Sequence, residues 1–152
     1  MPTNGQILLD FGYKLIKGYL RSRNLKYVQD SDRDFRVVFG GNSGTSLEVA
    51  LWIEEREKGP IYSICAFPDQ RVLKDDWGTV LSLCNTWNNQ RHWPRARLYM
   101  PENNTVGNIK LDFHVSINNE ITPELFAAIT DDVVRGAISF WEWYKNSRLS
   151  EK

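Results

Sequence analysis

Residues 109–117, Ile-Lys-Leu-Asp-Phe-His-Val-Ser-Ile, alternate apolar and polar side chains without interruption. A period of two places every second side chain on the same face of a β-strand. The stretch therefore predicts a strand with one apolar and one polar face. Such a strand is typical of an antiparallel sheet that faces a core on one side only.

Three runs nearer the N-terminus are also rich in strand-forming side chains, namely residues 35–39, 47–53 and 61–67. Turn-forming residues separate them, and short connections between consecutive strands predict an antiparallel meander. Residues 95–100, which directly follow a proline, predict one more strand.

Three segments have the apolar spacing of an amphipathic helix. The first two are residues 4–22 and 75–91, and Asp75 is the expected cap of the second. The third begins at Thr122-Pro123-Glu124, because threonine caps a helix, proline suits its first position and a carboxylate favours its positive end. The apolar face expected of this last helix comprises Leu125, Ile129, Val133, Phe140 and Tyr144.

The predicted order is therefore helix, three strands, helix, two strands, helix. It indicates an α+β fold with an antiparallel sheet and helices mainly on one face. The chain has 152 residues, the size of one domain. We expect the domain to span residues 1–147 and residues 148–152 to form a frayed tail.

The composition restricts the partners that the chain can bind. Nineteen Lys and Arg balance nineteen Asp and Glu, so the chain has no net charge that would attract nucleic acid or an anionic membrane. No apolar run reaches about 18 residues, and the N-terminal sequence lacks the pattern of a signal peptide. We therefore expect a cytoplasmic protein that does not bind membranes.

Residues 84–99, Cys-Asn-Thr-Trp-Asn-Asn-Gln-Arg-His-Trp-Pro-Arg-Ala-Arg-Leu-Tyr, resemble the YbjN family of bacterial sensory transduction regulators. The resemblance rests on the Trp-Asn pair and on Trp-Pro followed by a basic residue. It extends over about residues 72–145 and includes the aromatic run 140–143, whereas the first half agrees only in element order. The resemblance implies a fold like that of type III secretion chaperones, and it offers no catalytic motif to transfer.

The sequence contains no clear catalytic, metal or cofactor site. The glycine-rich stretch 40–45 lacks the lysine of a phosphate-binding loop and joins two strands, so a hairpin turn is expected. His92 and His114 have no further metal ligand at a suitable spacing, and Cys65 and Cys84 lie in apolar patterns. We expect a protein that is not an enzyme and needs no cofactor, although a site assembled only by folding stays open.

The only cluster of basic and aromatic residues contains Arg91, Trp93, Arg95 and Arg97. Such a cluster can stack on and pair with single-stranded nucleic acid or an acidic peptide. The simpler interpretation is that Trp93 closes the core while the arginines form a solvated strand face.

The meander places apolar side chains on both of its faces. The candidate interface on its second face comprises Val38, Ala50, Trp52, Tyr62 and Ile64. A contiguous apolar face of this kind marks contact with a second copy or a client protein. Alternatively, the N-terminal helix or a loop covers it.

These patterns favour a non-enzymatic regulatory or chaperone-like domain that binds an unidentified protein and acts as a homodimer. The alternative is a binder of nucleic acid or of an acidic ligand through residues 91–97. A small-molecule enzyme comes third.

Overall fold

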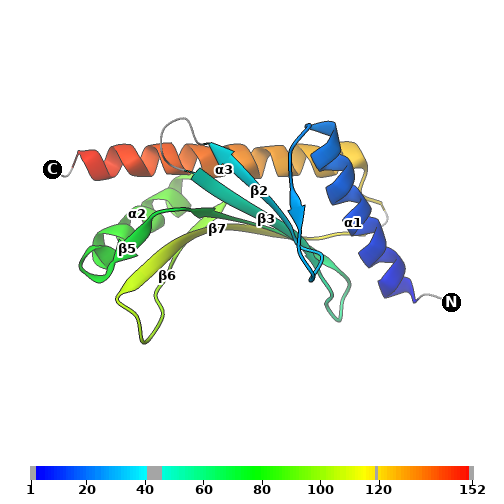
Figure 1. Cartoon of the computed structure of the whole chain (residues 1–152), viewed down its shortest axis with the longest axis horizontal. Helices are drawn as coiled ribbons and strands as arrows, with labels where there is room; N and C mark the ends of the chain where they lie inside the picture. The colour runs from blue at the N-terminus through cyan, green and yellow to red at the C-terminus, as the bar shows by residue number, and fades with distance from the viewer. Residues whose placement is uncertain (1–2, 41–45, 119, 151–152) are drawn as a thin grey trace.

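The computed structural model describes residues 3–40, 46–118 and 120–150. Within these residues it contains three α-helices, one short 3-10 helix and a seven-stranded antiparallel sheet (Figure 1). The predicted α+β class is confirmed.

A meander of three long strands forms one half of the sheet. β2 (Phe35–Gly40), β3 (Ser46–Glu54) and β4 (Ile61–Pro68) pair in chain order, as the sequence predicted. β1 (Val28–Gln29) adds a two-residue strand at the outer edge of β2, which the sequence pattern did not reveal.

β7 (Val106–Ser116) is the longest strand and contains most of the alternating run. Its residue Leu111 pairs with both β4 and β6 (Arg95–Tyr99), so these two strands lie on opposite edges of β7. Asn108 pairs with both β6 and the short β5 (Arg71–Leu73), so β5 shares the edge that β4 occupies.

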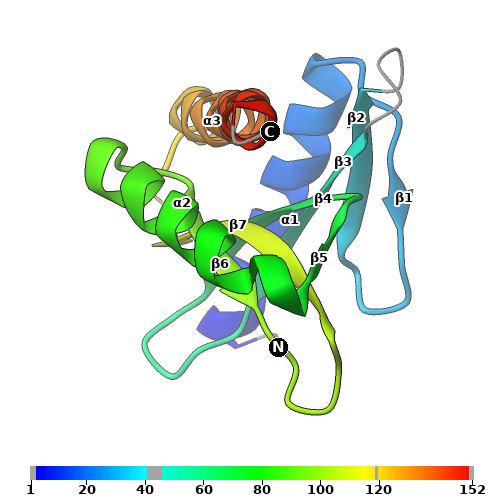
Figure 2. The same ribbon diagram turned by 90° about the vertical axis from the view of Figure 1, so that its left-hand side faces the viewer.

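All three helices pack on one face of the sheet, as Figures 1 and 2 show from two directions. α3 (Pro123–Leu149) runs across the sheet, α1 (Asn4–Ser22) lies at the meander side and α2 (Trp77–Gln90) lies beside β6. We call the other face, which none of these helices covers, the open face.

Tyr62 shows which way β4 faces. Its ring stacks on Phe126 of α3 with 4.3 Å between centroids, and its hydroxyl hydrogen-bonds the Thr130 hydroxyl at 2.9 Å. Tyr62 and Ile64 are both fully buried under the helices. Their predicted position on the second face of the meander is wrong, because β4 is apolar on both faces and its phase is set by pairing with β3.

The segment that carries the family resemblance stabilises the fold. Trp87 donates its indole N–H to the carbonyl oxygen of Pro94 at 2.9 Å. The amide of Asn88 both accepts from and donates to the backbone of Ala96, each bond being 2.9 Å long. α2 therefore covers the outer edge of β6, an edge that would otherwise expose unpaired backbone groups.

The predicted helix caps and apolar helix faces are only partly correct. Thr122 caps α3, since its hydroxyl accepts from the backbone N–H of Leu125 at 3.1 Å. Asp75 does not cap α2, because it lies inside a 3-10 helix, Lys74–Asp76, that precedes α2. Leu125 was expected on the apolar face but is 52% exposed, because α3 turns Phe126 toward the sheet instead.

The C-terminal end of α3 extends beyond the predicted boundary at residue 147. Arg148 and Leu149 continue the helix, and the guanidinium of Arg148 lies 3.3 Å from a carboxylate oxygen of Asp76. These two residues therefore belong to α3, and fraying of the tail stays a prediction. Most of the predicted glycine-rich turn, residues 41–45, lies outside the described residues.

Candidate functional site

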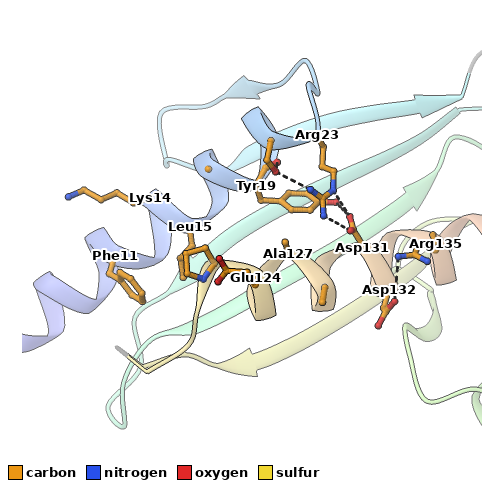
Figure 3. A pocket seen from close by; sticks show the side chains of 14 residues that line it. Phe11, Lys14, Leu15, Tyr19, Arg23, Glu124, Ala127, Asp131, Asp132 and Arg135 are labelled. Carbon is orange, nitrogen blue, oxygen red and sulfur yellow. Dashed lines mark hydrogen bonds and ion pairs between the residues drawn. The ribbon is translucent and has the colours of Figure 1, made fainter.

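A groove of about 750 Å³ lies between α1 and α3 on the helical side of the molecule (Figure 3). Phe11, Leu15 and Gly18 line it from α1, and Ala127 and Ala128 line it from α3. Small or apolar side chains on both walls leave open space between the two helices.

Two glycines of α1 have opposite surroundings. A Cβ atom at Gly12 would lie 2.8 Å from Cδ1 of Ile53 and 2.9 Å from Cδ1 of Ile117, so close packing against the sheet requires glycine there. A Cβ atom at Gly18 would meet nothing within 4 Å. Glycine inside a helix costs about 1 kcal/mol relative to alanine. At Gly12, close packing against the sheet explains why glycine is present despite this cost. At Gly18 no packing requires glycine, and the missing side chain leaves the groove wider.

A polar cluster at one end of the groove joins the two helices. The hydroxyl of Tyr19 donates to Oδ1 of Asp131 at 2.8 Å. Arg23 binds both carboxylate oxygens of Asp131, at 3.2 Å from Nε and 2.6 Å from Nη2 (Figure 3). The hydrogen bond from Arg23 is the main cause of a pKa of Asp131 below its usual range, and the bond from Tyr19 acts in the same direction.

Charged side chains line the remaining walls. Lys14 belongs to the α1 wall, while Glu124 and Asp132 belong to the α3 wall. Arg135 lies 3.8 Å from Asp132, and both are well exposed. The walls of the groove thus combine small and apolar side chains with charged side chains of both signs.

The open face does not hold the predicted interface in full. Tyr62 and Ile64 belong to the core, as described above. Val38 is 65% exposed on this face, Ala50 is buried among its neighbours, and Trp52 donates its indole N–H to Glu54 at 2.9 Å. α1 packs against the opposite face, so the alternative that α1 covers this surface is wrong.

The predicted basic patch is divided between two sides of the sheet. Arg95 and Arg97 lie on the open face of β6, where both bind Asp112. Arg91 lies over the ring of Trp87, 5.3 Å from its centroid. Trp93 does not close the core; it is 44% exposed, and its ring packs edge-on against that of Phe113. Phe113 lies on the sheet face that the helices cover, because it pairs with the buried Ile64 of β4. The four residues therefore do not form one surface.

Folding brings together one set of residues that the sequence analysis missed. Ser63 Oγ lies 2.7 Å from Nδ1 of His114, and Nε2 of His114 lies 3.9 Å from Asp112. Ser63 has no exposed surface, and its strand is paired on both edges, so the neighbouring backbone N–H groups are committed to the sheet. Within the part of the chain that the structure describes, the Ser63 hydroxyl is therefore enclosed by the sheet and its neighbours.

Asp112 of the open face pairs with two arginines. Burial raises its pKa, but hydrogen bonds from Arg95 and Arg97 outweigh this effect and hold the pKa below its usual value. By contrast, burial raises the pKa of Cys65 and of Cys84 to about 11, so both thiols are protonated at neutral pH.

Over residues 3–40, 46–118 and 120–150, no three His, Cys, Asp or Glu side chains are grouped closely enough to hold a metal ion. None of the helices in that part of the chain is both long and apolar enough to cross a bilayer. The cytoplasmic location stays a prediction.

These features define a class of protein: an α+β domain with helices on one sheet face and a helix-lined groove. The chain belongs to the YbjN family, whose model, described as "Putative bacterial sensory transduction regulator", matches residues 13–143. This assignment fits a regulatory, non-enzymatic role.

The chain is also similar to a solved structure, that of YbjN from E. coli, described as "a putative transcription regulator". The TM-score is 0.62 at 12% identity, and the match covers 82% of this chain and 84% of that chain. At this identity the likeness shows the fold alone. No curated protein matches the sequence. The likeness to type III secretion chaperones stays an expectation.

Proposed function

We propose that the chain is a non-enzymatic regulatory domain that binds a partner protein by taking an amphipathic helix of that partner into the α1–α3 groove. The observation that carries the proposal is Gly18, which weakens α1 and whose missing side chain leaves open space in the groove. Departures from local preference of this kind are expected where function requires them.

The shape and charge of the groove support a helix as its occupant. Two helices form its walls, and the small residues Gly18, Ala127 and Ala128 allow the backbone of a third helix to approach closely. Lys14 on one wall and Glu124 on the other suit a helix with an acidic edge and a basic edge around an apolar face.

Substitution at Gly18 tests the proposal. Peptides are selected on the wild-type chain from a phage-displayed library of amphipathic helices, and their affinities are measured by fluorescence anisotropy. Gly18→Phe fills the groove and should weaken binding by at least about tenfold, a loss of about 1.4 kcal/mol. Gly18→Ala adds only one methyl group to the groove, so it is the comparison by size and should lose less affinity than Gly18→Phe.

A urea titration of both variants shows whether they remain folded. Equal binding to wild type and a folded Gly18→Phe variant would contradict the proposal, as would a selection that enriches no helical peptide.

The homodimer is a separate proposal. With Tyr62 and Ile64 in the core, it depends on Val38, Ala50 and Trp52 of the open face. Light scattering coupled to size exclusion should give the mass of two chains for wild type and of one chain for Trp52→Glu.

Leu125→Glu, which changes an exposed apolar residue of α3, is the control and should remain a dimer. A monomeric wild type, or a dimeric Trp52→Glu variant, would contradict an interface at Trp52.

A further inference from the structure

The half of the open face formed by β6 and β7 holds its cations in fixed positions. Asp112, whose side chain is almost fully buried, accepts from Nε of Arg95 at 3.0 Å and from Nε of Arg97 at 2.7 Å. The two guanidinium groups are still substantially exposed. One carboxylate thus orients two arginines while leaving further N–H donors of each available.

Positive charge is in excess on this half. Lys110 is the direct cross-strand neighbour of Arg97, an arrangement of like charges that destabilises a sheet. With Arg95 and Asp112 the group carries three cations and one anion. On the other half of the same face, Arg36 is paired with Glu48 at 2.9 Å.

Aromatic rings lie directly beside these cations. The ammonium of Lys110 is 4.4 Å from the ring centroid of Tyr99 and 5.8 Å from that of Phe67. Tyr99 is 45% exposed, and Phe67 is partly buried on β4. Flat rings and preoriented cations therefore alternate on one surface of an antiparallel sheet.

We propose that this surface, comprising Arg95, Arg97, Lys110, Tyr99 and Phe67, binds single-stranded nucleic acid. Cations that neutralise phosphates and rings on which bases stack are the two elements of sequence-tolerant single-strand recognition. An acidic peptide would use the cations but not the exposed ring of Tyr99, so the aromatic component favours nucleic acid.

The test uses the whole chain and fluorescein-labelled, mixed-sequence 12-mers of single-stranded RNA and DNA. Fluorescence anisotropy between 50 and 200 mM salt measures the affinity and its salt dependence. The variant Arg97→Gln/Lys110→Gln should weaken binding by at least about tenfold and reduce the slope of log affinity against log salt by about 1.4, or 0.7 for each phosphate contact. This variant removes a like-charge pair, and Arg95 keeps its two hydrogen bonds to the buried Asp112, so we expect it to fold.

Two controls separate this surface from general electrostatics and from the groove. Arg36→Gln removes a cation from the same face and should leave the affinity unchanged. Gly18→Phe should also leave the affinity for nucleic acid unchanged, because Gly18 lies in the groove. Failure of the groove proposal would therefore not affect the nucleic-acid proposal. Tyr99→Ala should weaken binding roughly tenfold and Tyr99→Phe should not, because stacking needs only the ring.

The inference is overturned if the wild type binds neither 12-mer, or if Arg36→Gln and the double variant lose affinity equally. It is also overturned if a polyglutamate peptide of the same length binds as tightly as the 12-mers, because the site would then recognise acidic peptides.

Discussion

The middle of α1 and its C-terminal part face different environments, as Gly12 and Gly18 show. At Gly12 the helix is pressed against Ile53 and Ile117, whereas at Gly18 it borders an open groove. Both glycines carry the same intrinsic helix penalty, but only one receives close packing in return. The lesson is that a local sequence preference must be compared with the space around it before it is assigned to structure or to function.

The largest loss of folding stability is expected from Gly12→Val. The added methyl groups enter a filled space between α1 and the sheet, and overpacking of this kind costs about 1–3 kcal/mol. Urea denaturation should show a clearly lowered midpoint. An unchanged midpoint would mean that α1 does not press against the sheet at this position.

A smaller loss of stability is expected from Asp131→Asn, in the polar cluster at one end of the groove. Asparagine still accepts from the Tyr19 hydroxyl but carries no charge, so replacing a half-buried charge-assisted hydrogen bond by a neutral one should cost about 1 kcal/mol at neutral pH. The Asp131 pKa is lower in the folded chain than its usual 3.8, so the carboxylate contributes fully above the usual value and loses its contribution as pH falls through the folded value.

Urea midpoints measured from pH 7 to pH 2.5 check this sign. The urea midpoint of wild type should be higher than that of Asp131→Asn at pH 7, and the difference between the two midpoints should shrink as the pH falls below 3.8. A difference that is constant with pH would show that the carboxylate charge does not join α1 to α3.

The smallest effect has the opposite sign. Gly18→Ala should stabilise the chain by about 0.5–1 kcal/mol, because alanine favours the helix and its Cβ meets no other atom within 4 Å. Thermal unfolding followed by circular dichroism measures this gain. A loss of stability would mean that the groove is narrower at Gly18 than the structure shows.

The sequence predicted the fold where one face of an element is polar. β7 and the start of α3 were located because alternation and capping are local signals. The faces predicted for Tyr62 and Ile64 were wrong, because β4 is apolar on both faces and only its register with β3 decides which side chains point inward. The short strands β1 and β5 carry too few residues to show a period.

The groove could not be predicted because it depends on contacts between distant parts of the chain. Tyr19 and Asp131 are 112 residues apart, and neither lies in a recognisable motif. Gly18 could be recognised as a weak point of α1, but the space beside it requires α3 to be in place. The predicted cluster at residues 91–97 was divided because its members belong to different parts of the fold. Arg91 ends α2 and Trp93 lies in the connection that follows, whereas Arg95 and Arg97 lie on the open face of β6.

The central claim is that a partner helix occupies the α1–α3 groove. The most direct measurement is a titration of the ¹⁵N-labelled chain with a selected helical peptide, followed by amide chemical shifts in NMR spectra. We expect the largest changes at Gly18, Ala127 and Ala128, which line the groove. Changes confined to the open face, at Asn108 and Lys110 for example, would contradict it.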